Sequence, residues 1–342
     1  MHDIEKILQE KTPLIDDVIA RYMPKSYDEQ ALEYTLGKPR YRYATDAVNK
    51  TIADPAWELL GRGGKRWRPV LFLLVAEALG GNAEQCIDLV VIPELVHNGT
   101  LIVDDTEDFS DLRRGKPCIH KLFGNDVAIN AGNALYYIPL LSILKNKHTL
   151  GAETVAALFE IYAQEMINIS FGQGTDIAWH NDIDASVSED EYLQMCAYKT
   201  GTLARMAAKM AATVAGADAE IVEKLGRLAE TIGIVFQIQD DILNLAATSG
   251  KNQFTDEYIG SDITEGKRSL IIIKTLESAT QQDRQRLVDI LKMHTRNKTL
   301  ISEAIEIVKK YDSIDYAKEK ARKLIAQAWR DVDTLLPSSK AK

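Results

Sequence analysis

An apolar run leads directly into a group of acidic side chains in the stretch LIVDDTED, residues 101–108. A second stretch of the same kind, QIQDDILN, spans residues 237–244. On a helix, the outer members of each group, Asp104 with Asp108 and Asp240 with Asn244, lie on one face, one turn apart. Carboxylates in an apolar setting repel one another and resist leaving water, so they need positive charge from elsewhere. Mg2+ supplies such charge when one or two carboxylates bind it together with the phosphates of a substrate.

The composition is that of a soluble globular protein. The 342 residues are 46% hydrophobic and 27% charged, and the chain has ample length to bury a core. The net charge of −9 argues against a nucleic-acid partner. The three cysteines are widely spaced, which predicts no disulfide framework and a reducing compartment. We find no signal peptide, and the longest apolar run, residues 70–76, is too short to span a bilayer, so a cytoplasmic location is expected.

Helical periodicity dominates the chain and predicts an all-α fold. Apolar residues recur at helical spacing from Ile4 to Tyr22, and a charged amphipathic helix is expected over residues 316–336. Glycine clusters at 36–39, 61–64, 80–82 and 215–218 are expected to separate helices. Residues 247–266 are polar and predict a long loop. We interpret residues 1–342 as one helical domain, with the two acidic stretches facing each other across a cavity.

Two basic clusters accompany the acidic stretches. Arg113 and Arg114 follow the first stretch, and each could hold an anion; the alternative is a pair at a helix end that neutralises nearby carboxylates. The segment GGKRWR, residues 63–68, opens an apolar helix with three cations, which suits a diphosphate. It is not a Walker motif, because no Ser or Thr follows the lysine.

Further polar residues are ambiguous when taken alone. Lys199 and Thr200 follow an apolar segment, and Lys267 closes the polar loop. Gln173 and Asp176 share a helix face, where polarity between packed helices is the simpler explanation. His97 lies on an apolar helix and could equally be an ordinary core residue.

Taken together and in order, these motifs resemble those of the trans-prenyl diphosphate synthases. The matching motifs run from residue 63 to residue 269, and the first acidic motif lacks the insertion of many bacterial relatives. The chain is most similar to the geranylgeranyl diphosphate synthases of eukaryotic and archaeal type. The resemblance implies an isoprenoid-synthase-type bundle of helices around a central cavity, a homodimer, and about three Mg2+ ions with substrate bound.

The resemblance also assigns roles to individual residues. It implies that Mg2+ is bound chiefly by Asp104, Asp108 and Asp240, with Asp105, Asp176, Asp241 and Asp262 close by or bound through water. The allylic diphosphate would be held by Arg113, Lys199, Gln237 and Lys267, with Thr200 along its tail. Isopentenyl diphosphate would be held by Lys65, Arg68, His97 and Arg114. The residues implied to carry the chemistry are Asp104, Asp105, Asp108, Lys199, Asp240 and Lys267.

The implied reaction joins isopentenyl diphosphate head to tail to dimethylallyl, geranyl or farnesyl diphosphate. Positive charge stabilises the departing diphosphate, the allylic carbon ionises, and the isopentenyl double bond attacks it. The proton that is then lost is expected to pass to the released diphosphate, because no side-chain base is evident.

Product length is expected to depend on the residues one turn before Asp104. Gly99 and Thr100 are small there, which favours a product longer than farnesyl, with geranylgeranyl (C20) preferred over C15 or over C25 and longer chains. Tyr136 and Tyr137 could form a deeper floor, or they could be ordinary core aromatics.

The chain departs from the family pattern near Asp262. Many relatives carry a lysine four or five residues earlier, where this chain has Tyr258 and Glu257; Lys251 is the nearest substitute. Three other functions remain as alternatives: a class I terpene cyclase, a non-catalytic regulatory subunit, and an acidic structural helical protein. The second basic cluster argues against the cyclase, and the intact acidic motifs argue against the subunit.

Overall fold

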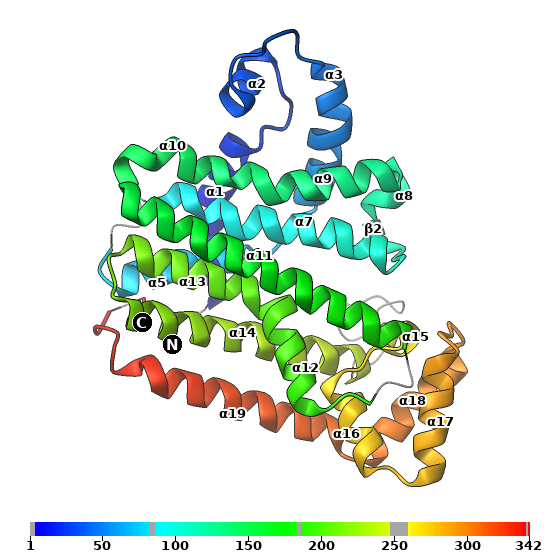
Figure 1. Ribbon diagram of the computed structural model, residues 1–342. Helices are drawn as coiled ribbons and strands as arrows, with labels where there is room; N and C mark the ends of the chain where they lie inside the picture. Colours follow the sequence, from blue (N-terminus) through cyan, green and yellow to red (C-terminus); the bar gives the residue numbers. More distant parts are fainter. Residues whose placement is uncertain (1–3, 82–85, 183–185, 247–258, 340) are drawn as a thin grey trace. The chain divides into compact units, whose positions relative to one another are not determined.

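A computed structural model describes residues 4–81, 86–182, 186–246, 259–339 and 341–342 of the chain. Nearly every regular element in these ranges is a helix, and a pair of two-residue strands is the exception (Figure 1). The prediction of an all-α fold is therefore confirmed.

The elements have the following bounds. The α-helices are α1 (Ile4–Tyr22), α2 (Glu29–Leu36), α3 (Thr45–Val48), α4 (Asp54–Leu60), α5 (Trp67–Ala78), α7 (Val91–Glu107), α8 (Ile119–Phe123), α9 (Asn125–Tyr137), α10 (Leu141–Leu150), α11 (Ala152–Asn181), α12 (Glu189–Cys196), α13 (Thr202–Val214), α14 (Ala219–Ala246), α15 (Ser261–Glu265), α16 (Leu270–Ser278), α17 (Gln281–Lys292), α18 (Lys298–Lys310) and α19 (Ser313–Asp333). The π-helices are η1 (Asn49–Ala53) and η4 (Ala197–Gly201), and the 3-10 helices are η2 (Ile87–Val90) and η3 (Ile138–Leu140). The strands are β1 (Leu112–Arg113) and β2 (Lys116–Pro117).

Helix boundaries agree with the glycine clusters of the sequence. Gly37 follows α2, Gly61 follows α4, Gly80 follows α5, and Gly216 lies between α13 and α14. The predicted loop over residues 247–266 is wrong at its end, because residues 261–265 form α15. Gly260 and Gly266 flank this short helix with φ of 76° and 71°, a backbone conformation that glycine adopts without strain. Residues 247–258, which include Lys251, Glu257 and Tyr258, lie outside the described ranges.

The chain divides into two compact units. The first holds Met1–Tyr162, Met206–Leu225 and Leu336–Lys342, and the second holds Ala163–Arg205 and Gly226–Leu335. The first acidic motif thus belongs to the first unit and the second motif to the second unit. One domain over residues 1–342, with the motifs facing each other, stays a prediction.

Helix α7 packs closely against helix α9 in the first unit. A Cβ atom on Gly99 would lie 2.7 Å from the carbonyl oxygen of Gly132, and a Cβ on Gly132 would lie 2.7 Å from Val103. These distances leave no room for a side chain, so the two glycines set how closely the helices approach. The approach holds α7, which carries the first acidic motif, against α9.

The second unit has its own apolar core. Its fully buried members include Ile238, Ile263, Leu270, Ile271, Leu287, Ile290 and Val308. Beside this core, η4 lies between two close backbone contacts. A Cβ on Gly172 of α11 would be 2.4 Å from the amide nitrogen of Lys199, and a Cβ on Gly233 of α14 would be 2.6 Å from the Cα of Gly201.

The stretch Asn125–Leu150 is long and apolar enough, by length and composition, to cross a membrane. Buried core helices pass the same test, and 39% of an apolar 18-residue window within this stretch is buried in the protein. Part of it is α9, whose inner face packs on α7.

Candidate active site

The first acidic motif lies at the C-terminal end of α7. The Asp108 N–H donates to the Asp104 carbonyl at 2.8 Å, so these two carboxylates are one helical turn apart, as the spacing predicted. Both are partly exposed, whereas Asp105 between them is fully buried. The motif therefore presents Asp104 and Asp108 toward solvent and keeps Asp105 inside.

Asp105 is paired with Arg113. The Nε of Arg113 donates to Oδ1 of Asp105 at 2.8 Å, and Nη2 donates to the same oxygen; Nη2 is also 3.7 Å from Oδ2 of Asp104. Burial by itself lowers the pKa of Arg113, but the attraction of Asp105 outweighs burial and leaves the pKa raised. Arg113 thus remains charged and spans the two adjacent aspartates.

Arg113 and Arg114 lie in a β-hairpin. The alternative that they form a pair at a helix end is therefore wrong. Strands β1 and β2 pair antiparallel, with Arg113 opposite Lys116. Arg114 and Gly115 make the turn, with φ of 53° and 73°. Positive φ at both central residues is typical of two-residue hairpins. The glycine at position 115 was the feature of the sequence that could have predicted this turn.

The segment between α4 and α5 forms the second basic cluster. Arg66 is left-handed, with φ of 47°, and its guanidinium is buried. Its Nη1 donates to Oε1 of Glu94 at 2.7 Å, and its Nε donates to Oδ1 of Asp16 at 2.9 Å. Glu94 lies on α7 and is only 3% exposed. Sequence reasoning missed Glu94 and the structural role of Arg66, because the two are far apart along the chain.

The surroundings of Arg68 and His97 contain more positive than negative charge. Burial lowers the pKa of Arg68 to about 10 although Glu94 opposes the shift, and the Arg68 Nε has no hydrogen-bond partner within the described residues. Burial and then the charges of Arg68 and Arg114 hold the pKa of His97 well below its usual value. Lys65, three residues before Arg68, is exposed. Such a set is suited to an anion that brings two or more negative charges.

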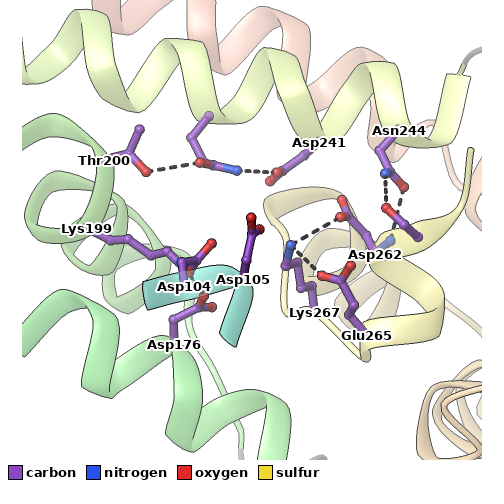
Figure 2. A network of polar contacts seen from close by, with 12 residues as sticks. Asp104, Asp105, Asp176, Lys199, Thr200, Asp241, Asn244, Asp262, Glu265 and Lys267 are labelled. Carbon is purple, nitrogen blue, oxygen red and sulfur yellow. Dashed lines mark hydrogen bonds and ion pairs between the residues drawn. The ribbon is translucent and has the colours of Figure 1, made fainter. Parts of the chain in front are cut away.

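The second acidic motif differs from the first in exposing one aspartate instead of two. Asp240 is exposed, but Asp241 is buried and accepts from the Tyr192 hydroxyl at 2.6 Å and from Nε2 of Gln237 at 2.9 Å. Thr200 completes this chain by donating to Oε1 of Gln237 at 3.0 Å (Figure 2). Burial raises the pKa of Asp241 to about 6, although these donors act against the shift. Tyr192 gave no signal in the sequence.

Asn244 of α14 is hydrogen-bonded to the first residues of α15. Its Nδ2 donates to Oγ of Ser261 at 2.8 Å, and its Oδ1 accepts from the Asp262 N–H at 3.3 Å (Figure 2). The amide at this position therefore holds the start of α15, and Asp240 is the member of the second motif that remains exposed.

Two lysines of the second unit are held by carboxylates. Lys267 Nζ lies 2.6 Å from Glu265 and 3.7 Å from Asp262 (Figure 2), and Lys199 Nζ lies 2.5 Å from Oδ2 of Asp176. Burial lowers the pKa of Lys267, but Glu265 and Asp262 outweigh burial and leave the pKa raised well above its usual value. Burial raises the pKa of Asp262, against the opposing effect of Lys267. Glu265 is a further residue that sequence reasoning missed.

The residues expected to set product length occupy different surroundings. Gly99 faces α9, where Cε1 of Tyr136 would be 3.0 Å from an added Cβ. Thr100 is partly buried and donates to the His97 carbonyl at 2.8 Å, whereas Tyr137 is 68% exposed. Close packing of α7 on α9 is thus sufficient reason for a glycine at position 99. A role of these residues in product length stays a prediction.

Across the described ranges, no three His, Cys, Asp or Glu side chains gather closely enough to hold a metal by themselves. The donors that are present, Asp104 and Asp108 on one helix turn, match an ion that takes one or two carboxylates and completes its shell with phosphate and water. The residues therefore fit a Mg2+ ion that arrives with a diphosphate.

Comparison with known proteins places these motifs in a family. A family model described as polyprenyl synthetase matches residues 49–308. A short chain isoprenyl diphosphate synthase from Methanothermobacter thermautotrophicus is 33% identical over 80% of this chain and 81% of its own length. A geranylgeranyl diphosphate synthase from Saccharolobus solfataricus is 34% identical over 80% of this chain and 81% of its own length.

The fold agrees with these sequence relatives. The crystal structure of geranylgeranyl pyrophosphate synthetase from Pyrococcus horikoshii superimposes with a TM-score of 0.82 at 32% identity, covering 98% of this chain and 94% of that one. The family model spans both acidic motifs and both basic clusters. The chain therefore belongs to the polyprenyl synthetase family of trans-prenyl diphosphate synthases.

Proposed function

We propose that this protein is a Mg2+-dependent prenyltransferase that condenses isopentenyl diphosphate with an allylic diphosphate and releases geranylgeranyl diphosphate. The observation that carries the proposal is the excess positive charge around Arg68 and His97, close along α7 to partly exposed carboxylates. A cation cluster of this kind is balanced by a diphosphate. A carboxylate pair next to it is balanced by a divalent cation.

The two diphosphates are assigned to different residues. Lys65, Arg68, His97 and Arg114 would hold isopentenyl diphosphate in the first unit. Arg113, Lys199, Gln237 and Lys267 would hold the allylic diphosphate, with Thr200 along its chain. Arg113, Lys199 and Lys267 already have carboxylate partners, which keep these cations charged and oriented before substrate arrives.

Mg2+ would be held by Asp104, Asp108 and Asp240, and when bound it supplies positive charge to the departing diphosphate. The buried carboxylates Asp105, Asp176, Asp241 and Asp262 have protein partners and would support the ligands or bind through water. The cationic side chains stabilise the negative charge that develops as the allylic carbon–oxygen bond breaks. The isopentenyl double bond then attacks the allylic carbon, and the released diphosphate takes the proton.

The C20 product is proposed from two observations. The residue one turn before Asp104 is the small Thr100, and two of the three relatives named above are geranylgeranyl synthases. A farnesyl product or a C25 and longer product is distinguished from C20 by direct measurement of chain length.

We further propose a cytoplasmic homodimer. Large apolar side chains are exposed along α8, α9 and α10: Leu122, Ile129, Tyr137 and Leu144. Ile129 and Tyr137 are eight residues apart and lie on one face of α9. An apolar stripe of this kind is typical of an interface between subunits.

The test is elongation of labelled isopentenyl diphosphate with Mg2+ and, in separate reactions, dimethylallyl, geranyl or farnesyl diphosphate. Chromatography of the dephosphorylated products should show C20. Asp104→Asn should lower the rate roughly 100-fold or more, because a carboxylate that stabilises transition-state charge is lost. Asp111→Asn serves as the matched control, since Asp111 is exposed and pairs with Lys121 at 3.0 Å. No elongation with any of the three primers would refute the proposal.

A further inference from the structure

Two basic segments of the first unit are joined by reciprocal arginine bonds. We call them the glycine-rich loop (Gly61–Arg66) and the hairpin (Leu112–Pro117). Arg62 of the loop donates to the hairpin carbonyls of Arg113 at 2.9 Å and Pro117 at 2.8 Å, with a longer contact to Lys116 at 3.4 Å. In return, Arg114 donates to the carbonyls of Gly63 and, at 3.3 Å, of Leu59.

Arg62 has no capacity left for a substrate. Its side chain is 1% exposed, and its remaining donors bind Glu58, from Nε to the carbonyl at 3.1 Å and from Nη2 to Oε1 at 3.2 Å. A guanidinium presents five N–H donors in a rigid fork, and here they are directed at one helix end and one hairpin. All of its donors are therefore engaged within the protein, in contrast to the exposed Lys65.

The hairpin needs such support. Strands of two residues are too short to be stable by themselves, and Arg114 occupies a left-handed conformation that is unfavourable for a non-glycine residue. Arg113 extends from the same hairpin to Asp105 of the first acidic motif. Any shift of the hairpin would therefore move Arg113 and Arg114 together and disturb the pair that Arg113 makes with Asp105.

We propose that Arg62 is a positioning residue that ties the hairpin to the glycine-rich loop. It thereby keeps a constant spacing between the segment of Arg113 and Arg114 and the segment of Lys65. The inference rests on the proposed function, because it takes these segments to hold diphosphates. Displacement of binding groups by about 1 Å can cost on the order of 100-fold in rate, so a spacing device has a measurable effect.

The first test compares Arg62→Gln with the wild type in steady-state elongation. The KM for isopentenyl diphosphate should rise on the order of 10- to 100-fold, with a smaller change in kcat, because binding geometry is altered and no reacting group is removed. The KM of Arg62→Lys should lie between those of the wild type and Arg62→Gln, since one ammonium cannot reach all the carbonyls that the guanidinium binds. Arg21→Gln is the control, because it removes an arginine ion pair of the same unit, to Asp88 at 2.7 Å, without touching either segment. An unchanged KM in Arg62→Gln would overturn the proposal.

A double-mutant cycle separates positioning from general destabilisation. If Arg62 acts through the hairpin, adding Arg62→Gln to Arg114→Gln should change the KM by less than about threefold, because the two effects share one structure. Full multiplication of the two effects would overturn the proposal. Should Arg62→Gln fail to fold, Arg62→Lys takes its place in the same cycle.

Hydrogen exchange tests the tie without relying on activity. Amides of residues 111–118 should exchange faster in Arg62→Gln than in the wild type or in Arg21→Gln. If the wild type fails to elongate any primer, the proposed function falls, and this comparison alone decides whether Arg62 holds the hairpin. Equal exchange in all three proteins would overturn the role of Arg62 even in an active enzyme.

Discussion

At the scale of the residue, two buried arginines of the first unit, Arg66 and Arg68, depend on the same buried carboxylate. Glu94 is the buried counter-ion of Arg66, and it also opposes the fall in the pKa of Arg68. A buried cation with incomplete neutralisation is costly in the absence of a ligand. That cost is reduced when a diphosphate enters, so the same residues that destabilise the empty site favour binding.

His97 makes stability depend on pH. Its folded-state pKa lies below its unfolded value because burial and the neighbouring arginines disfavour the imidazolium, so the unfolded state takes up the proton first. This contribution to stability is therefore fully present above about pH 6.5 and is lost as pH falls from there toward the lower folded-state pKa of His97. In His97→Gln this contribution should vanish. Denaturant unfolding at pH 5.5 and 7.5 measures it, and an equal pH effect in both proteins would contradict the prediction.

Thr100→Phe should shorten the product. A phenyl ring one turn before Asp104 would occupy the space expected for the growing chain, so C15 should replace C20 as the main product. Thr100→Ser is the matched control, because it keeps a hydroxyl for the His97 carbonyl and adds no volume. Chromatography of products from dimethylallyl and geranyl primers measures the change, and C20 as the main product of the phenylalanine variant would refute the pocket assignment.

At the scale of the element, η4 depends on glycines in its neighbours. Gly172 of α11 lies against the backbone of Lys199, and Gly233 of α14 lies against Gly201. These contacts place Lys199 where it meets Asp176, one turn beyond Gly172 on the same helix. π-Helical turns are often found at functional sites, and this one carries Lys199 and Thr200.

Gly172→Ala should displace η4. The added Cβ would lie 2.4 Å from the Lys199 nitrogen, which is backbone and cannot move aside cheaply. We expect a loss of roughly 1–3 kcal/mol in stability and a raised KM for the allylic diphosphate. Gly174→Ala on the same helix is the control, because nothing lies within 4 Å of its Cβ position. Thermal unfolding and steady-state kinetics measure both effects, and equal behaviour of the two variants would count against the argument.

At the scale of the whole molecule, the exposed apolar stripe of α9 predicts self-association. Ile129→Lys combined with Tyr137→Lys should raise the dissociation constant of the dimer at least about 100-fold, because charge is placed in an apolar contact. Met293→Lys, at a residue 54% exposed in the second unit, is the control. Sedimentation equilibrium measures the mass; a monomeric wild type would contradict the dimer, and a variant as dimeric as the wild type would contradict the interface.

Most features of the fold and the site that the sequence predicts correctly depend on residues close together along the chain. The helical fold, the breaks after α2, α4, α5 and α13, and the placement of Asp104 and Asp108 on one turn follow from patterns within a few residues. The hairpin at Arg114 and the helix α15 were missed. Each is short, and its stability comes from contacts made elsewhere in its unit.

The amino-acid sequence by itself determined which chemical groups this protein has: two acidic motifs on helices and two basic clusters. Only the tertiary structure decided which charges are paired. Glu94 binds an arginine 28 residues away, and Arg62 binds carbonyls more than 50 residues away. Such pairs form because a buried charge must find a partner wherever the fold brings one, and no local pattern encodes that distance. The pairing leaves Asp104, Asp108 and Asp240 at least partly exposed to solvent and holds Asp105 and Asp241 inside.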